Sequence, residues 1–592
     1  MTSEKENNIA TVIAAYPNKL RIAVDNLSKF KSLDDQAKDL QIGSYLEISD
    51  NNNCKLLAVI ESYSIEVVEA VGEDGKKKDQ NKYIIEACPL GTIDSSNGNQ
   101  FKRGGDSLAI PPSNVRPANK DDIKKIYSIN DPKKKFCFST LAKNRDIDVH
   151  IDGNKFFNKH FAIIGSTGSG KSHTVATILQ QAVKEKSDES FELNNSHIVL
   201  FDIHDEYKKA FPQANHINSK NIKIPYWLFD SEELADLFIE SNEENSHNQV
   251  SQFRYAVTEN KKIHNSDLPK DKIYFDSPLK FKIQEVVRYI KNINNEVIGK
   301  CENEGLPKKQ DGSLITDDKK LTTYFSEDVK FCEQSTAKAD KAGAGPYKGY
   351  FERFILRLET TIKNPRLQFL FDENHNLGLE DILKQFLGYG DKKSNITVID
   401  LSGIPFEVLS ITVSLISRIL FEYGYYYKKL LNATDTDCDT PLLLVYEEAH
   451  KYVPKSDLVK YRASRAAIER IAKEGRKYGI TLAIVSQRPS EISETIFSQC
   501  NNFISMRLTN YDDQNYVKRL LPDTSGNLTD ILPSLQSGEA LLIGESVILP
   551  SIVKINFPEL EPSSSDIPYL EIWRDKWKEV KFDQIAKKWS GN

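Results

Sequence analysis

The sequence has few cysteines, and they form no pattern that binds a metal. The seven cysteines of the 592-residue chain are scattered, no two form a C-x-x-C pair, and no histidine cluster accompanies them. An odd and sparse set of this kind is typical of reduced thiols rather than of a zinc site or a disulfide framework. We therefore expect reduced thiols in a cytoplasmic protein.

Long hydrophobic runs are also missing. No run of 18 apolar residues occurs, and the segment 1–16 has no apolar core after a basic start. A membrane-spanning helix needs the first feature and a signal peptide needs the second. We expect a protein that does not enter a membrane.

The chain has no excess of positive charge. Its formal net charge is −6, with 39% hydrophobic and 28% charged residues. This balance excludes a basic protein that coats DNA, and it allows a large buried core. Nucleic acid remains a compatible partner, because a ring can line its channel with Lys and Arg while its outer surface stays acidic. The length suggests three or four domains, or one core with large insertions.

Residues 1–130 are rich in short β-prone runs separated by Asn, Asp and Gly clusters, such as KLRIAV, SYLEIS and KYIIEACPLGTI. Many short strands at this spacing favour a small barrel or a sandwich. We expect an accessory β-domain without chemistry of its own.

From about residue 157 the pattern changes to strands that alternate with helices. Five buried-looking strands are expected, at 161–164, 197–202, 396–400, 442–446 and 481–486. This alternation predicts an α/β fold with a parallel sheet that carries helices on both faces.

The region 226–390 is polar and rich in Lys and Asn, and we expect a helical insertion in the core. One helix is predicted to begin at Ser277-Pro278 and to run with apolar residues on one face as far as Val297. The stretch 301–350 is expected to be a loop. No internal repeat is evident.

A glycine-rich sequence follows the first of the five strands. Gly165-Ser166-Thr167-Gly168-Ser169-Gly170-Lys171-Ser172 fits G-x-x-x-x-G-K-[ST] at every position. Glycines let the backbone turn its N–H groups toward phosphate, the lysine neutralises the β- and γ-phosphates, and the serine hydroxyl binds Mg²⁺. We predict an ATP site that takes Mg²⁺, with His173 as its last residue.

Two adjoining carboxylates, Glu447 and Glu448, follow the strand 442–446. Ligands of open α/β sheets bind at the carboxyl ends of the strands. One carboxylate can hold Mg²⁺ and its neighbour can deprotonate the attacking water. Most P-loop proteins have Asp at the first position, so the metal role of Glu447 is the less secure of the two.

Two further sequence features suit the same chemistry. Gln487 ends the strand 481–486 and can sense the γ-phosphate. The helix 465–479 carries Arg476 and Lys477 in its last turn, where cations also simply suit the helix dipole. The sharper interpretation of Arg476 is an arginine finger that acts on a neighbouring subunit.

The ordered set HFAIIGSTGSGKSHT, VLFDIHDEY, VIDLSGIP, LLLVYEEAHKYVP, IAKEGRKYGITLAIVSQRPSEIS and FISMRLTN resembles the HerA family, of the HerA/FtsK branch of P-loop ATPases. The resemblance covers roughly 1–225 and 390–560. It implies a RecA-like core, a small N-terminal β-barrel, a homohexamer and double-stranded DNA in a central channel. The implied division is 1–130 barrel, 131–225 first part of the core, 226–390 helical insertion, 391–560 second part of the core, and 561–592 tail.

The resemblance also assigns roles to residues. Lys171 and Ser172 bind phosphate and Mg²⁺, Glu448 is the catalytic carboxylate, and Gln487 is the sensor. Arg476 is the preferred finger and Arg507 the second choice. Two further groups each have two interpretations. Support for the site, or less favourably metal binding, is expected of Asp202, His204 and Glu206. A channel loop or a solvated basic loop is expected of Lys451, Lys455 and Lys460.

Three functions fit these features. The first is a DNA translocase or helicase that works with a separate nuclease. The second is the ATPase platform of an anti-phage complex that activates an effector, either a nuclease or a sirtuin-like, NAD-consuming protein. The third is a conjugation or secretion ATPase, against which the lack of a membrane anchor counts. No nuclease motif occurs in the chain, so any cleavage belongs to another protein.

Overall fold

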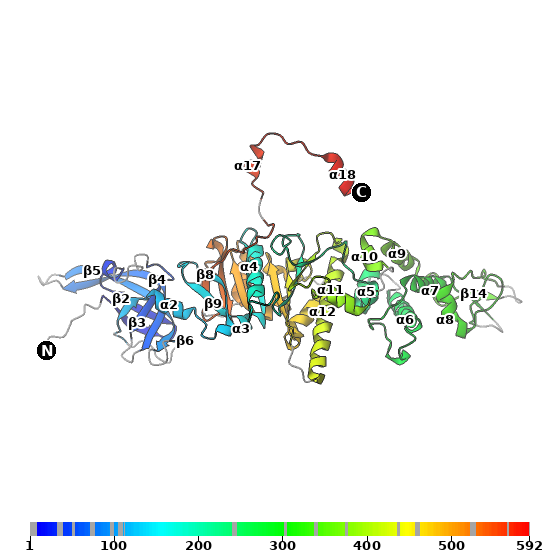
Figure 1. Cartoon of the computed structure of the whole chain (residues 1–592), viewed down its shortest axis with the longest axis horizontal. Helices are drawn as coiled ribbons and strands as arrows, with labels where there is room; N and C mark the ends of the chain where they lie inside the picture. Colours follow the sequence, from blue (N-terminus) through cyan, green and yellow to red (C-terminus); the bar gives the residue numbers. More distant parts are fainter. Residues whose placement is uncertain are drawn as a thin grey trace.

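A computed structural model gives the fold of the chain. The structure describes residues 9–31, 40–49, 54–71, 77–94, 100–104, 111, 113–239, 246–300, 305–336, 341–372, 377–434, 439–455, 462–520, 529–564 and 567–590. Three parts follow one another along the longest axis, an N-terminal sheet, a central sheet and a helical region, and a C-terminal tail leaves the central part to one side (Figure 1).

The N-terminal sheet has seven antiparallel strands in the order β1-β2-β5-β4-β3-β7, and β6 pairs with β5. Its outermost strands also meet, because Val12 N donates to Ser113 O at 3.0 Å, next to β7. Leu20, Ile22 and Ile85 are fully buried between the strands. The elements are β1 (Ala10–Tyr16), β2 (Lys19–Val24), α1 (Leu27–Lys31), β3 (Tyr45–Ser49), β4 (Cys54–Val71), β5 (Lys77–Asp94), β6 (Gln100–Arg103) and β7 (Val115–Pro117).

The central sheet has eleven strands in the order β12-β15-β11-β16-β17-β10-β18-β19-β20-β8-β9. The first seven are parallel to their neighbours, and the remaining four pair antiparallel. All five predicted strands are confirmed to within one residue. The strands are β8 (Lys135–Leu141), β9 (Asp148–Asp152), β10 (His160–Ile164), β11 (His197–Asp202), β12 (Asn215–Ile217), β15 (Ile396–Asp400), β16 (Leu442–Tyr446), β17 (Ile480–Ser486), β18 (Cys500–Met506), β19 (Glu539–Gly544) and β20 (Ser551–Ile555).

Helices cover this sheet. The helix expected at 465–479 begins earlier, and its α-helical part ends at Glu474; the turn Gly475–Tyr478 is 3₁₀ and stops at Gly479, whose φ of 72° is left-handed. The helices are α2 (Lys120–Ile126), α3 (Gly153–Phe157), α4 (Lys171–Lys184), α12 (Phe406–Thr434), α13 (Arg462–Glu474), α14 (Glu494–Ser498) and α15 (Tyr511–Leu520).

Among the described helices, α12 alone is long and apolar enough to cross a membrane, over Val408–Thr434 with a mean hydropathy of 1.2. Polar residues interrupt this stretch, so it contains no uninterrupted run of 18 apolar residues although its mean hydropathy is high. Because 78% of its most apolar window is buried inside the protein, α12 is a core helix that packs on the sheet.

The helical region joins β12 to β15. Its members are α5 (Ser231–Phe238), α6 (Ser246–His264), α7 (Ile283–Asn295), β13 (Val297–Gly299), α8 (Asp317–Ser326), β14 (Ala342–Ala344), α9 (Glu352–Ile362), α10 (Gln368–Phe371) and α11 (Leu379–Phe386). Arg418 of α12 ties the region to the core: its guanidinium donates to Glu233 of α5 at 2.7 Å and to Leu228 O at 2.6 Å.

Two expectations for this region are wrong. The helix predicted from Ser277 begins at Ile283, because the buried Lys261 ammonium takes the carbonyl oxygens of Phe275 and Ser277 at 2.5 and 2.6 Å and holds this segment outside the helix. Val297 begins a strand instead of ending the helix.

The expected loop 301–350 contains structure as well. Helix α8 buries Tyr324 and Phe325 against α7, and β14 pairs with β13. The apolar residues of these elements are too few and too widely spaced among polar ones to show a period in the sequence.

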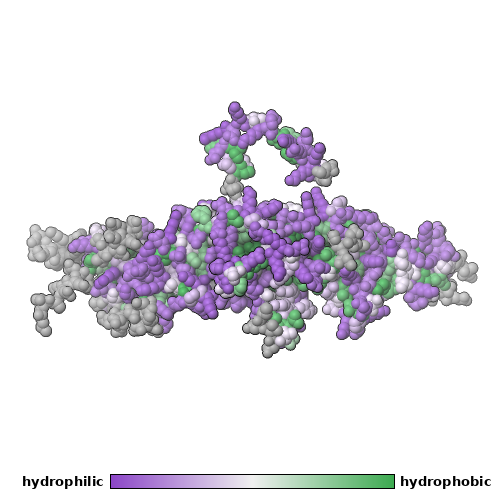
Figure 2. All heavy atoms as spheres, viewed as in Figure 1, coloured by the Kyte–Doolittle hydropathy of each residue, from purple (hydrophilic) through white to green (hydrophobic). Residues whose placement is uncertain are grey.

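Two short helices lie in the tail, α17 (Tyr569–Trp573) and α18 (Phe582–Trp589). They stand away from the body of the molecule and expose green, apolar side chains (Figures 1 and 2). Elsewhere the visible surface is mostly hydrophilic (Figure 2).

Candidate active site

The predicted site residues converge on one edge of the central sheet. Strands β10, β17, β16 and β11 are parallel neighbours, so their carboxyl ends meet there. The glycine-rich loop follows β10, Gln487 follows β17, Glu447 and Glu448 follow β16, and Asp202 ends β11. Residues more than 300 positions apart are thereby brought to the start of α4.

The loop 165–170 forms the cradle for phosphate, and its backbone conformation requires glycine at several positions. A Cβ on Gly165 would lie 2.6 Å from Ser169 Oγ and 2.8 Å from Met506 Cβ. Gly168 and Gly170 have φ of 71° and 105°, in the left-handed region. Ser169 N donates to Ser166 O at 3.2 Å and closes the turn. The loop therefore has the shape that lets backbone N–H groups surround a phosphate.

Neighbouring segments fix this loop from outside. Ser166 N donates to Arg507 O at 2.8 Å, and Gly538 N donates to Ser169 O at 2.8 Å. Gly165 N donates to Ser486 O at 3.3 Å. The cradle is thus held by the ends of β17 and β18 and by the turn before β19.

Lys171 and Ser172 open helix α4. Lys171 is only 8% exposed, and Nζ lies 3.4 Å from Ser166 O, within the cradle. Ser172 Oγ donates to Glu206 Oε2 at 2.8 Å. The serine hydroxyl is therefore beside a carboxylate, as a divalent cation at this position requires. The residues present fit Mg²⁺ bound together with phosphate.

Glu447 is almost fully buried at the end of β16. The Tyr207 hydroxyl donates to Oε2 of Glu447 at 2.8 Å, and Tyr452 OH donates to the Glu447 carbonyl oxygen. Burial, followed by the charge of Glu448, raises the pKa of Glu447 well above its usual range, and the Tyr207 hydrogen bond acts in the opposite direction. Sequence reasoning did not identify Tyr207, although it lies in the motif that includes Glu206.

Glu448 adopts a left-handed backbone conformation, with φ 48° and ψ 45°. This conformation is rare for a residue with a side chain, and such strain is concentrated at functional sites. The Oε2 atom is buried, and no hydrogen bond to it is found within the described parts of the chain. Nδ1 of His450 lies 3.2 Å away, at ion-pair distance. A carboxylate oxygen of this kind, at the sheet edge that carries the phosphate loop, can accept a proton from water.

The pKa values of the two glutamates are shifted in opposite directions. Burial alone would raise the pKa of Glu448, but His450 and Lys171 outweigh it, and the net shift is downward. The pKa of Glu447 is shifted upward. Of the two neighbouring carboxyl groups, Glu447 therefore holds a proton the more tightly.

Gln487 contacts the glycine-rich loop directly. Thr167 Oγ1 donates to Gln487 Oε1 at 2.7 Å. The glutamine thus lies at the tip of the cradle, between the loop and the end of β17. Of the loop residues, only Thr167 contacts Gln487 through its side chain in the described structure.

The three residues Asp202, His204 and Glu206 do not form one cluster. Asp202 is fully buried and turns back on its own loop, where it accepts from His204 N at 3.1 Å and Tyr207 N at 3.0 Å. His204 instead lies 3.3 Å from Lys451 Nζ. Across the described ranges, no group of three His, Cys, Asp or Glu side chains is placed to hold a metal. The prediction that this trio binds a metal is wrong. Asp202 orders the loop that carries Glu206 and Tyr207, and support of the site by this loop stays a prediction.

The two candidate arginines lie at opposite edges of the sheet. Arg507 follows β18, beside the cradle. Arg476 precedes β17 and lies near Lys159, whose pKa it helps to lower after burial. Lys159 precedes β10, so Arg476 is at the edge away from its own phosphate loop. It is exposed and forms no ion pair with any residue that the structure describes.

The three lysines proposed for a channel loop are not equivalent. Lys451 lies beside His204, and Lys455 forms an exposed ion pair with Glu494 at 2.5 Å. Lys460 lies outside the described residues.

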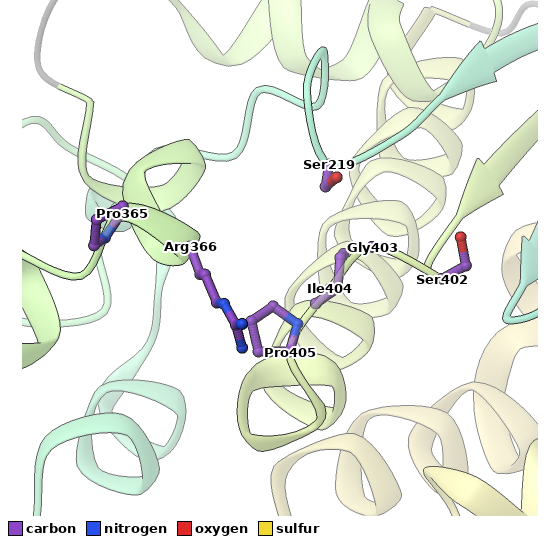
Figure 3. Close-up of a pocket in the computed structure, with 7 residues that line it drawn as sticks. All are labelled: Ser219, Pro365, Arg366, Ser402, Gly403, Ile404 and Pro405. Atoms are coloured by element: carbon purple, nitrogen blue, oxygen red, sulfur yellow. The ribbon is translucent and has the colours of Figure 1, made fainter. Parts of the chain in front are cut away.

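A separate open hollow of about 460 Å³ follows β12 and β15 at the same edge (Figure 3). Ser219, Ser402 and Arg366 line it, and the Arg366 side chain extends toward Pro405. Strands β11, β16 and β17 separate this hollow from β10. It holds neither the glycine-rich loop nor the glutamate pair, so the chemistry described above does not take place there.

Comparison with known proteins gives a consistent family. The model of the family described as "Helicase HerA, central domain" matches residues 136–420. A probable helicase of Methanocaldococcus jannaschii is 25% identical, over 92% of this chain and 93% of its own length.

The "DNA double-strand break repair helicase HerA" of Saccharolobus solfataricus is 28% identical, over 81% of this chain and 79% of its own. Among solved structures, VirB4 of Thermoanaerobacter pseudethanolicus aligns with a TM-score of 0.42 and 14% identity, over 74% of this chain and 98% of that one. With the phosphate loop and the glutamate pair at one sheet edge, the sequence matches identify residues 136–420 as a HerA central domain, in a P-loop ATP hydrolase that resembles HerA helicases over most of its length.

Proposed function

We propose that the chain is the subunit of a homohexameric ring that moves double-stranded DNA through its channel by hydrolysing ATP. The observation that carries this proposal is the phosphate cradle at the same sheet edge as Glu448, whose buried Oε2 lies 3.2 Å from His450 Nδ1. Within it, 1–130 serves as a small barrel, 131–225 with 391–560 as the RecA-like core, 226–390 as a helical insertion and 561–592 as a tail.

In the hydrolytic step, the phosphates are held by the Lys171 ammonium and by the backbone N–H groups of the loop that have no carbonyl partner among the described residues, those of residues 167, 168 and 170–173. Ser172 and Glu447 would hold Mg²⁺, which supplies positive charge against the phosphate oxygens when bound. Glu448 Oε2 accepts the proton of the attacking water. The Ser172 hydroxyl can keep its hydrogen bond to Glu206 in this arrangement, because it would bind the cation through an oxygen lone pair.

Gln487 acts as the γ-phosphate sensor in this proposal. Its hydrogen bond to Thr167 places the side chain amide at the tip of the cradle. A phosphate in the cradle would offer this amide a charged acceptor, and the strand β17 would transmit the change to the preceding turn, where Arg476 lies. Hydrolysis on one subunit is thereby linked to the finger of the same subunit.

Arg476 serves the site of a neighbouring subunit, because it lies at the edge away from its own cradle. Arg507 is placed for its own site instead, since its carbonyl oxygen already binds the loop. This difference in position supports Arg476, the preferred candidate, over Arg507 as the finger.

Mixed rings test the finger. Lys171→Ala subunits lack the cradle cation and Arg476→Ala subunits lack the finger, and each variant alone should be inactive. Random mixing in equal amounts makes about a quarter of the interfaces complete. We expect about that fraction of the wild-type ATPase rate to return. No recovery at any mixing ratio would contradict the role in trans.

The matched control for the mixing experiment is Arg470→Ala on the same helix. Arg470 stacks on Phe421 at 4.3 Å and binds Glu422 at 3.0 Å, so its role is local. This variant alone should retain ATPase activity.

Double-stranded DNA is the proposed substrate of the motor, and a separate nuclease or other effector its partner. The names of the relatives favour the motor over the platform of a defence complex. DNA should stimulate hydrolysis, and the stimulation should fall with added salt, since the contacts are to phosphates. Lys455→Ala should reduce the stimulation and leave the basal rate. We place this activity in the cytoplasm.

A further inference from the structure

Phe557 is an exposed aromatic residue on a fixed backbone. Its side chain is 81% exposed, two residues after β20. Asn556 N donates to Phe138 O at 3.0 Å, and Thr177 Oγ1 donates to the Asn556 carbonyl at 2.9 Å. Because the backbone is already held, little conformational entropy is lost when a flat ligand binds against this exposed ring.

The segment that follows Phe557 is also tied to α4. Gln180 receives the N–H of Glu559 at its Oε1 atom, at 2.8 Å, and its Nε2 donates to Leu560 O at 2.8 Å. The chain from 556 to 560 therefore lies along the helix that begins with the phosphate-binding residues.

The order of the strands gives the direction of a bound nucleotide. Gln487 and Glu448, which meet the γ-phosphate in the proposed function, follow β17 and β16 on one side of β10. The base, at the other end of the nucleotide, then points to the opposite side, over β18, β19 and β20. Phe557 follows the last of these strands at the same edge, because β20 is parallel to β10 through two antiparallel pairings.

Hydrogen bonds show that Phe557 is close to the cradle. Ile555 N donates to Gly538 O at 2.9 Å, and Gly538 N donates to Ser169 O at 2.8 Å. The end of β20 is thus one residue away from the phosphate loop. On α4, Thr177 Oγ1 contacts both Asn556 and the carbonyl oxygen of His173, one turn earlier. The backbone next to Phe557 is thus held by α4 one turn after His173.

We propose that Phe557 is the platform on which the base of the bound nucleotide stacks. This inference rests on the proposed function, and it adds a recognition element that the phosphate chemistry does not contain. Stacking does not read the edges of a base, but it is stronger for larger rings. The site should therefore favour purine over pyrimidine nucleotides and discriminate little between adenine and guanine.

The test compares a ligand with a base and a ligand without one. Binding of Mg²⁺-ADP and of Mg²⁺-pyrophosphate is measured by calorimetry on the full chain. Phe557→Ala should weaken ADP binding about 5- to 100-fold, the range found when a base loses its aromatic partner. Pyrophosphate binding should stay within about twofold, because the cradle is intact. Phe557→Tyr keeps the ring and should bind ADP as the wild type does.

The control is Phe582→Ala, which removes another exposed phenylalanine, 72% exposed on α18. It should leave both ligands unaffected. The platform is refuted if Phe557→Ala binds ADP normally, or if it loses ADP and pyrophosphate equally, which would show a subunit contact or a structural role. Wild-type protein that binds neither ligand would overturn the ATPase proposal itself, a result distinct from both.

Discussion

His160 offers a perturbation whose size follows from the geometry. It begins β10, the strand that leads into the phosphate loop, and is 1% exposed. Its Nε2 atom lies 2.9 Å from Ala472 O, and Leu482 N donates to Nδ1 at 2.9 Å. These partners require a neutral imidazole with its proton on Nε2. The residue joins β10 to β17 and to the end of α13.

Two effects should follow from replacing His160. Leucine leaves the Ala472 carbonyl and the Leu482 N–H buried without partners, at about 1–3 kcal/mol each. The second effect depends on pH, because burial lowers the pKa of His160 from 6.5 to about 4. A shift of this size corresponds to about 3 kcal/mol.

The sign is set by which state binds the proton. Between pH 6.5 and about 4 the unfolded chain is protonated at His160 and the folded chain is not. The free energy of unfolding of the wild type is therefore highest above pH 6.5, the pKa of this histidine in the unfolded chain, and it decreases as the pH falls through this window. About 2 kcal/mol of it is lost by about pH 5. His160→Leu lacks this loss.

Urea unfolding followed by circular dichroism measures both effects. We expect His160→Leu to be less stable than the wild type at about pH 8, and the difference to shrink toward pH 5. A difference that is constant across the window would refute the neutral, buried histidine. A variant as stable as the wild type at pH 8 would refute the importance of its two hydrogen bonds.

Three other changes have expected outcomes. Tyr207→Phe removes the hydrogen bond that favours the ionised form of Glu447 and so raises its pKa further. The pH–rate profile of ATPase should therefore move to higher pH, and an unchanged profile would contradict this. Arg418→Met leaves Glu233 buried without its cation, and should cost about 3–5 kcal/mol in thermal unfolding, against no measurable loss if the pair is unimportant. Gly165→Ala should abolish nucleotide binding because the new Cβ collides with the loop, whereas Gly390→Ala, with open space around it, should bind normally.

Most of the site could be predicted from the sequence because its parts are local. The apolar run before Gly165 or Glu447 predicts a buried strand, and the position of the residue after that run predicts the sheet edge at which it lies. The same reasoning located Gln487. Parallel pairing of strands then brings these residues together without further information.

Contacts between distant segments could not be predicted in this way. Tyr207 and Glu447 are 240 residues apart, and their hydrogen bond depends on the adjacency of β11 and β16. The start of α7 was misplaced because Lys261, on another helix, binds the carbonyl oxygens that would have opened it. Secondary-structure propensity depends on residues that are close in the sequence, whereas these hydrogen bonds join residues that are close only in the folded structure.

The arginines show the same limit. The sequence makes Arg476 the first candidate for the finger and Arg507 the second, but it does not show that one precedes its strand and the other follows it. Their separation to opposite sheet edges is visible only when both strands are placed beside β10.

The central claim is that the cradle holds ATP while Glu448 sets up its attack by water. The most direct measurement compares ATP binding with hydrolysis in Glu448→Gln and Lys171→Ala. The account predicts that Glu448→Gln binds Mg²⁺-ATP as tightly as the wild type but does not hydrolyse it, and that Lys171→Ala does neither. Hydrolysis by Glu448→Gln at the wild-type rate, or nucleotide binding unaffected by Lys171→Ala, would contradict it.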